Sequence, residues 1–156
     1  LEKIYQSIFV GTLLIIDYGL ESYRYYNPKR FSGTALCYYK NKSYNDLFLM
    51  PGNSDITAHI LIDKVKADAV RIGWNLLGEI RQGEALLALG LSQRLYELQK
   101  LPQDKLQEAL TRREALLRLV DPTCLGELRW IAFEKNNEKI FKEKSFYTHF
   151  LDQPSI

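Results

Sequence analysis

The stretch from Leu13 to Tyr39, LLIIDYGLESYRYYNPKRFSGTALCYY, decides how this sequence folds. Four apolar residues end abruptly at Asp17, and a loop crowded with tyrosine and arginine then leads to a second apolar run. Short apolar runs that are bounded by glycine and polar residues indicate buried strands. An acid at the mouth of such a strand is therefore the first candidate for a functional side chain.

Length and composition indicate a soluble globular protein. The chain has 156 residues, of which 26% are charged and 46% hydrophobic, and this length allows a single domain, residues 1–156, with a core of its own. The formal net charge of +2 is too small to favour nucleic acid or an anionic membrane as a partner. No apolar run approaches the roughly 20 residues of a membrane span.

The cysteines and histidines do not have metal-binding spacing. Cys37 and Cys124 lie far apart and lack C-x-x-C spacing, so we expect two buried, reduced thiols. His59 and His149 do not form an H-x-x-x-H pair, so no metal site is predicted. A Gly-x-Ser-x-Gly elbow and a phosphate-binding loop that ends in Lys-Ser/Thr are also absent.

The order of apolar patterns predicts an α/β fold with a mixed sheet. Apolar residues at helical spacing predict helices over residues 2–9, 62–72, 83–98 and 103–119. Short apolar or alternating runs predict strands over residues 12–16, 34–39, 55–60, 74–80 and 128–133. The first of these strands is apolar on both faces, which is typical of a parallel sheet covered by helices.

Asp17 has two interpretations. In open α/β sheets, ligands bind outside the carboxyl ends of the strands, where an acid can accept hydrogen bonds from a ribose, an amine or a guanidinium. Gly19 would let the backbone turn tightly beside such a ligand. The alternative is that Asp17 only caps a turn, and the residues alone do not separate the two.

The loop after Asp17 carries Arg24, Lys29 and Arg30 among its tyrosines. These cations could hold a phosphate or stack on a planar group. The alternative is a solvated lid that is anchored by its aromatic side chains.

Asp55, Thr57 and His59 alternate along a predicted strand, which would place all three on one face. A carboxylate beside an imidazole can orient the ring for proton transfer. The competing interpretation is a structural histidine whose hydrogen bonds are satisfied by its neighbours.

Several motifs, taken in order, resemble the MidA family of S-adenosylmethionine-dependent methyltransferases. The resemblance covers most of residues 10–133. Its motifs are Asp17-Tyr-Gly19, Arg30 with Gly33-Thr34, Cys37-Tyr38, Pro51-Gly52, Asp55-Ile-Thr-Ala-His59, Gln82 followed by ALLALGL, and the late DPTCLGELRWIAF.

This resemblance implies a Rossmann-like methyltransferase fold with added helices, of which the chain would be the C-terminal portion. The parent protein would use S-adenosylmethionine, but the glycine-rich loop that binds it is absent, since no Gly-x-Gly occurs. The chain would then supply the substrate side and need the N-terminal half of the same protein as its partner. On its own it would bind cofactor weakly or not at all and be inactive. In this scheme the catalytic residues are Asp17, Asp55 and His59, and the substrate contacts are Tyr18, Gly19, Arg30 and Thr57.

The resemblance also implies a substrate and a compartment. Mitochondrial members of the family resemble protein-arginine methyltransferases that assist the assembly of respiratory complex I, so a subunit of that kind is the expected protein substrate. Asp17 and Asp55 would orient its guanidinium, while Tyr18 and Tyr38 would form walls of the pocket. The expected location is the cytoplasm in a bacterium and the mitochondrion in a eukaryote.

Two other functions stay open. The leucine-striped helices over residues 83–119 could dock a partner or form a homodimer, which would make the chain a non-enzymatic interaction module. A third interpretation is a self-standing small α/β enzyme that uses Asp55 and His59 as a catalytic pair.

Overall fold

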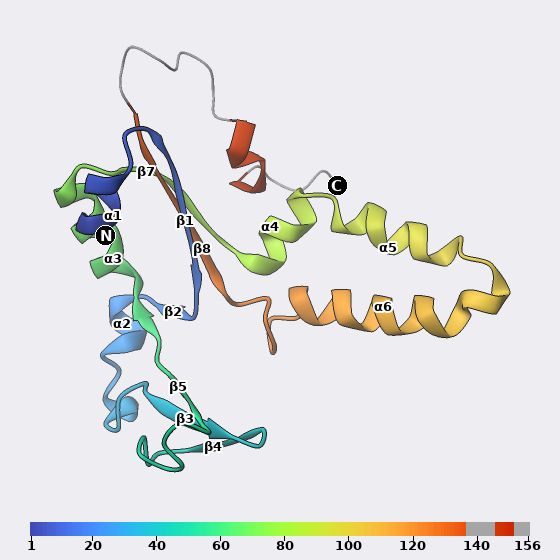
Figure 1. Ribbon diagram of the computed structural model, residues 1–156, viewed down its shortest axis with the longest axis horizontal. Helices are drawn as coiled ribbons and strands as arrows, with labels where there is room; N and C mark the ends of the chain where they lie inside the picture. The colour runs from blue at the N-terminus through green and yellow to red at the C-terminus, as the bar shows by residue number, and fades with distance from the viewer. Residues whose placement is uncertain (137–145, 152–156) are drawn as a thin grey trace. The chain divides into compact units, whose positions relative to one another are not determined.

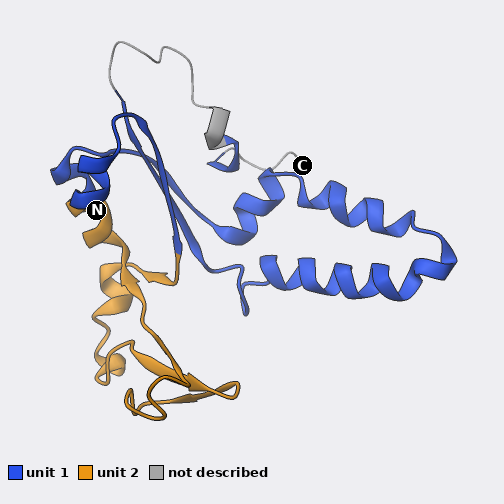
Figure 2. Cartoon of the chain, viewed as in Figure 1, with its two compact units in different colours: residues 1–16, 69–156 blue, residues 17–68 orange. Residues whose placement is uncertain are grey.

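The computed structural model describes residues 1–136 and 146–151 and consists of helices and short sheets (Figure 1). The described chain divides into two units, residues 1–16 with 69–156 and residues 17–68 (Figure 2). We call them unit 1 and unit 2. Both contain helices and strands, and pairing is parallel in one sheet and antiparallel in others. The predicted mixed α/β class is confirmed.

The sheet of unit 1 has the strand order β1-β8-β7. The strands are β1 (Gly11–Asp17), whose last residue already belongs to unit 2, β7 (Asn75–Arg81) and β8 (Arg129–Lys135). Strands β7 and β8 pair antiparallel, with an irregularity between Leu76 and Gly78. The two strands are joined by the helices between residues 82 and 120, of which α4 packs against both strands.

The core of unit 1 lies on strand β8. Three consecutive residues of that strand, Ile131, Ala132 and Phe133, are fully buried, so both faces of the strand are covered. Trp74 is also buried, and its ring meets that of Tyr5 edge-on at a centroid distance of 5.3 Å. Apolar burial on both faces of β8 explains why its sequence, RWIAFEK, reads as a nearly continuous apolar run.

The helices of unit 1 follow the predicted ranges with one exception. The single helix predicted over residues 83–98 is wrong: the chain forms two helices separated at Gly90, which has a φ of 90°. Glycine reaches this left-handed conformation without the steric penalty of a Cβ atom. The helices are α1 (Glu2–Ser7), α4 (Gln82–Ala88), α5 (Leu91–Gln99), α6 (Leu106–Val120) and the short 3-10 turns η2 (Gln103–Lys105) and η3 (Phe146–Leu151).

Unit 2 contains two small sheets. In the first, β2 (Gly19–Leu20) pairs parallel with β6 (Ile60–Leu61). In the second, β3 (Leu36–Tyr39) lies between two antiparallel neighbours in the order β4-β3-β5, where β4 is Lys42–Tyr44 and β5 is Asp55–Thr57.

Helix α3 (Ile62–Ile72) begins in unit 2 directly after β6 and ends at Gly73, as predicted. Two short helical segments precede the second sheet, α2 (Ser22–Tyr25) and the 3-10 turn η1 (Pro28–Arg30). The Asp63 carboxylate accepts hydrogen bonds from the Ser22 amide at 2.7 Å and the Ser22 hydroxyl at 2.6 Å. These two hydrogen bonds to Asp63, in the first turn of α3, hold the start of α2 in place.

Three local predictions need correction. The alternating run 55–60 is not one strand, because β5 ends at Thr57 and β6 starts at Ile60 in a different sheet. The polar segment 41–54 contains a strand that the sequence did not indicate, β4. Cys37 is buried as expected, but Cys124 is exposed.

Strand β1 is not covered on both faces within the described residues. Its burial alternates along its length, and the side chains of Leu14 and Ile16 are 38% and 45% exposed.

No helix in residues 1–136 or 146–151 is long and apolar enough to cross a membrane.

Candidate functional site

The candidate site lies in unit 2, where β1 gives way to β2. One oxygen of the Asp17 carboxylate accepts a hydrogen bond from the Tyr18 amide at 2.7 Å. This hydrogen bond is the turn cap that the second interpretation of Asp17 predicts. The negative charge of Asp17 also acts on His59, where it opposes the lowering of the imidazole pKa.

The pairing of β2 with β6 brings Tyr18 and His59 together. The Ile60 amide donates to the Tyr18 carbonyl at 2.8 Å, which fixes the register at the start of both strands. The ring of Tyr18 then meets the imidazole of His59 at a centroid distance of 6.1 Å and an interplanar angle of 61°. Edge-to-face contact of this kind holds the two rings in defined orientations.

His59 has the most unusual surroundings of the predicted site residues. Its backbone amide donates to the Thr34 hydroxyl at 3.3 Å. Its ring atom Nδ1 is buried and has no hydrogen-bond partner among the described residues. A buried ring nitrogen without a partner is costly unless another molecule satisfies it, which makes this atom a candidate contact for a ligand.

The environment favours the neutral form of His59. Burial lowers the pKa of the imidazole below its usual 6.5, and the guanidinium groups of Arg30 and, to a smaller extent, Arg24 lower it further. A backbone hydrogen bond at Thr34 and the charge of Asp17 act in the opposite direction but are outweighed. A neutral imidazole whose Nε2 carries the proton presents Nδ1 as a hydrogen-bond acceptor.

We group Tyr18 and His59, whose rings meet, with Asp17 and Arg30, whose charges act on the imidazole, and call these four residues the His59 cluster. Arg30 is exposed at the end of η1 and makes no ion pair with the described residues, and Gly19 begins β2 next to Tyr18. Thr34 was not predicted as a site residue. Its only sequence signal was its place after Gly33 in the motif that leads into the strand 34–39.

Asp55 and Thr57 lie in β5, opposite Tyr38 and Leu36 of β3. Asp55 is exposed, and it is not among the groups that shift the pKa of His59. The argument that placed Asp55 and His59 on one strand face does not hold, because β5 ends before His59. The proposed roles of Asp55 and Thr57 stay predictions.

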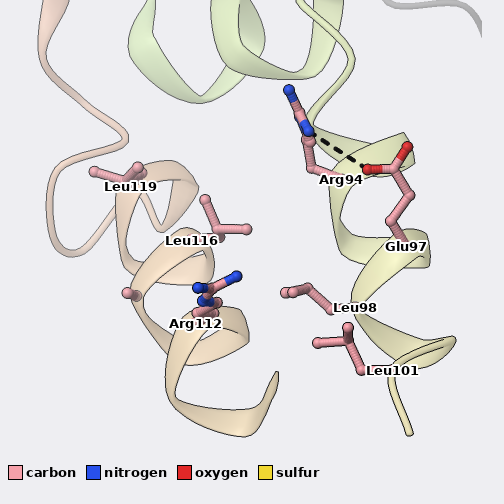
Figure 3. Close-up of a pocket in the computed structure, with 8 residues that line it drawn as sticks. Arg94, Glu97, Leu98, Leu101, Arg112, Leu116 and Leu119 are labelled. Atoms are coloured by element: carbon pink, nitrogen blue, oxygen red, sulfur yellow. Dashed lines mark ion pairs between the residues drawn. The ribbon is translucent and has the colours of Figure 1, made fainter. Parts of the chain in front are cut away.

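A groove in unit 1 lies between α5 and α6 (Figure 3) and has a volume of about 640 Å³. Leu98 of α5 and Leu116 of α6 point into the space between the two helices, and Leu119 also lines the groove. Two ion pairs lie along it, Arg94 with Glu97 at 3.5 Å and Arg112 with Glu108 at 2.6 Å. The described residues contain no group of three His, Cys, Asp or Glu side chains that could hold a metal ion.

Comparisons with known proteins give a consistent result. A family model described as "Putative S-adenosyl-L-methionine-dependent methyltransferase" matches residues 1–80. No curated protein matches the chain. The structure is similar to that of an uncharacterized protein from Burkholderia thailandensis, with a TM-score of 0.76 and 31% identity over 86% of this chain.

A second similar structure is described as that of a "likely methyl transferase" from Burkholderia thailandensis bound to S-adenosyl-homocysteine. Its TM-score is 0.76, with 30% identity over 86% of this chain. The chain spans only 35% and 34% of the lengths of these two proteins.

Proposed function

The chain belongs to the family of S-adenosyl-L-methionine-dependent methyltransferases whose model it matches, and from that premise we propose that it forms the C-terminal, acceptor-binding part of a protein-arginine methyltransferase. The Rossmann-like core and the MidA type of the parent protein are parts of the same proposal. The matched residues 1–80 include the whole of unit 2 and with it the His59 cluster. Use of S-adenosylmethionine is supported by the similar protein that is bound to S-adenosyl-homocysteine.

The observation that carries the proposal is the buried Nδ1 atom of His59 without a partner. A nitrogen that accepts a methyl group must give up a proton, and a neutral imidazole can accept it. The Asp17 carboxylate would orient an incoming guanidinium through its oxygen that does not bond the Tyr18 amide. Tyr18 would form a wall of the pocket and hold His59 in position.

The electrostatics of the His59 cluster also suit a guanidine acceptor. Arg24 and Arg30 carry positive charge close to His59. Neighbouring cations disfavour the protonated form of a bound guanidine, and only the neutral form has a lone pair that can attack a methyl group. Alignment of that lone pair supplies much of the rate in such transfers.

The residues of this chain do not fit the glycine-rich part of a cofactor site. None of the strands in the described ranges is followed by a Gly-x-Gly turn and a helix, because the chain has no Gly-x-Gly. We therefore propose that the N-terminal half of the parent protein binds the cofactor and is the partner of this chain. The exposed Leu14 and Ile16 of β1 offer an apolar surface for that half.

Isothermal titration calorimetry with S-adenosyl-homocysteine tests this division of the site. We expect the protein from the complete reading frame to bind the ligand with micromolar affinity. The 156-residue chain alone should bind more than about 100-fold more weakly, because it has no Gly-x-Gly turn to hold the cofactor. Equal affinity of the two proteins would contradict the proposal that this chain lacks the cofactor site.

The protein substrate and the compartment are further parts of the proposal. The methyl acceptor would be a subunit of the respiratory complex I type. The parent protein would work in the cytoplasm of a bacterium or the mitochondrion of a eukaryote. These points rest on the sequence resemblance alone.

The groove between α5 and α6 supports a second candidate function, association with a second copy of this chain. The groove has a leucine floor, and both signs of charge lie along it in the pairs Arg94–Glu97 and Arg112–Glu108. Two copies related by a two-fold axis could therefore place opposite charges against each other while burying the leucines.

Replacing Leu116 by glutamine in this groove should weaken such a dimer by at least about tenfold, since a buried leucine contributes roughly 1.5–3 kcal/mol. Sedimentation equilibrium would measure the monomer–dimer constant. Leu110→Gln is the matched control, because Leu110 lies on the same helix, is 50% exposed and does not line the groove. A chain that is monomeric at all concentrations would exclude this candidate.

A further inference from the structure

Residues 22–45 of unit 2 have an unbalanced composition. This segment contains five basic residues, Arg24, Lys29, Arg30, Lys40 and Lys42, and not one acidic residue. It also contains seven aromatic residues, Tyr23, Tyr25, Tyr26, Phe31, Tyr38, Tyr39 and Tyr44. We call residues 22–45 the basic aromatic segment. The whole chain has a net charge of only +2, so the positive charge is concentrated here.

Many aromatic side chains of the basic aromatic segment face solvent. Phe31 is 93% exposed, Tyr23 is 76% exposed and Tyr26 is 69% exposed. Large aromatic side chains gain free energy when they are removed from water. Several exposed together, interleaved with cations, are typical of a surface that binds a partner.

The hairpin between β3 and β4 presents further cations. Its turn residues Lys40 and Asn41 have φ values of 49° and 60°. A left-handed backbone is unfavourable for a lysine, so the chain accepts some strain where glycine would relieve it. Lys42 follows in β4, whose residues are all exposed and which forms one edge of its sheet.

Most cations of the basic aromatic segment have no ion-pair partner among the described residues. Arg24 forms an ion pair with Glu21 at 3.8 Å. Lys29, Arg30 and Lys42 make no ion pair with any residue in the described part of the chain. The Thr34 hydroxyl of this segment accepts a hydrogen bond from the His59 amide at 3.3 Å, so the basic aromatic segment contacts a residue of the proposed acceptor site.

We propose that the basic aromatic segment binds an acidic stretch of the polypeptide that carries the methyl acceptor. This inference rests on the proposed function for its link to the acceptor, and it adds the substrate class: an arginine flanked by aspartate or glutamate. The cations would pair with the flanking carboxylates, and the aromatic side chains would cover the apolar parts of the peptide. The exposed edge of β4 offers backbone hydrogen bonds to an extended chain.

A nucleic acid fits this surface less well. Asp46 follows the segment directly, Asp55 lies opposite Tyr38 in the neighbouring strand, and the formal net charge of the whole chain is small. A polyanion would meet those carboxylates along its backbone, whereas a short peptide can place its acidic residues only against the cations. We therefore assign the surface to a peptide.

Fluorescence anisotropy with a short labelled peptide tests the proposal without cofactor or turnover. The probe has a central arginine flanked by glutamate and glycine, and the comparison peptide has lysine in place of each glutamate. We expect the 156-residue chain to bind the acidic probe at least about tenfold more tightly than the lysine peptide, and this preference to shrink as salt is raised. Equal binding of the two peptides would overturn the proposal.

Matched triple variants locate the binding surface. Lys29→Gln, Arg30→Gln and Lys42→Gln together should weaken binding of the acidic probe about tenfold. Lys3→Gln, Lys105→Gln and Arg113→Gln together remove the same charge from exposed positions of unit 1 that also make no ion pair with the described residues. This variant should leave binding within about twofold. Equal weakening by the two triple variants would overturn the proposal.

A charge-conserving variant separates lost charge from lost folding. Lys29→Arg, Arg30→Lys and Lys42→Arg together should bind the acidic probe like the unaltered chain. Anionic vesicles and single-stranded RNA are the alternative probes, and tighter binding to either of them than to the peptide would overturn the assignment. Peptide binding that persists when the complete protein fails to bind S-adenosyl-homocysteine would instead count against the proposed methyltransferase function alone.

Discussion

Replacing His59 by glutamine is expected to reduce methyl transfer by the complete protein about 100-fold, the lower range for loss of a positioned general base. The reason is the buried Nδ1 atom, which has no partner among the described residues and would take the proton that the acceptor releases. The measurement is single-turnover transfer of a labelled methyl group to an acidic arginine peptide. Glutamine is of similar length and polar, but its amide does not accept a proton near neutral pH.

The pH dependence of turnover separates a proton acceptor from a purely structural histidine. The pKa of His59 is lowered below 6.5 by burial and by Arg30, and only the neutral ring can act as a base. Turnover should therefore persist at pH values where an ordinary histidine is half protonated, and fall as the pH drops through the lowered pKa. Arg30→Gln removes a cation, raises the pKa of His59 and should shift this acid limb to higher pH.

His149 provides the matched control, because it is the other histidine of the chain and lies exposed in η3 of unit 1. His149→Gln should leave turnover and the acid limb unchanged. Full turnover by the His59→Gln protein would remove His59 from the catalytic machinery and leave it a packing partner of Tyr18. An acid limb that does not move in Arg30→Gln would contradict the electrostatic coupling between the two residues.

The sequence indicated which residues belong to the candidate site, but it did not indicate which of their side chains contact one another. Asp17 and His59 were both named from the sequence, and the structure places Tyr18, the neighbour of Asp17, against the His59 ring. Their proximity depends on the parallel pairing of β2 with β6, two strands too short to be recognised from periodicity. The alternation of Asp55, Thr57 and His59 instead indicated one continuous strand, and the chain leaves that strand at Ala58.

The same limit applies to the fold. Helix α3 was predicted with its bounds because a full apolar stripe and a terminal glycine specify it. The predicted helix over residues 83–98 was wrong because its apolar pattern runs through Gly90, and an isolated glycine weakens a helix without always ending it. Strand β4 was missed because all its side chains are exposed and it therefore lacks an apolar pattern.

The side chain of Gln82 links helix α6 and the loop after it to strand β8. Replacing Gln82 by alanine is expected to lower the free energy of unfolding by about 3 kcal/mol. Gln82 is buried, with only 7% of its surface exposed to solvent. Its amide nitrogen donates to the carbonyls of Leu119 at 3.0 Å and Leu125 at 3.1 Å. Its amide oxygen accepts from the indole nitrogen of Trp130 at 3.2 Å.

One side chain thus satisfies polar groups from the end of α6, from the loop after it and from β8. Alanine would leave the Leu119 carbonyl and the Trp130 indole N–H without the partner that Gln82 provides, whereas the Leu125 carbonyl keeps its bond from the Leu128 amide at 3.1 Å. Each unsatisfied buried group costs roughly 1–3 kcal/mol. Urea unfolding followed by tryptophan fluorescence would measure the loss. Gln93→Ala is the control, because Gln93 is exposed on α5 and its amide, within the described residues, donates only to the Glu97 carboxylate, at 3.4 Å.

The control should change stability by less than about 0.5 kcal/mol, as exposed substitutions usually do. A Gln82→Ala protein as stable as the Gln93→Ala protein would mean that water replaces the three hydrogen bonds without loss. The junction of α6, its following loop and β8 would then depend on apolar packing alone. Gln82→Glu separates these cases further, because a carboxylate keeps the acceptor for Trp130 but cannot donate to the two carbonyls, so it should be destabilising even though the side chain keeps its size.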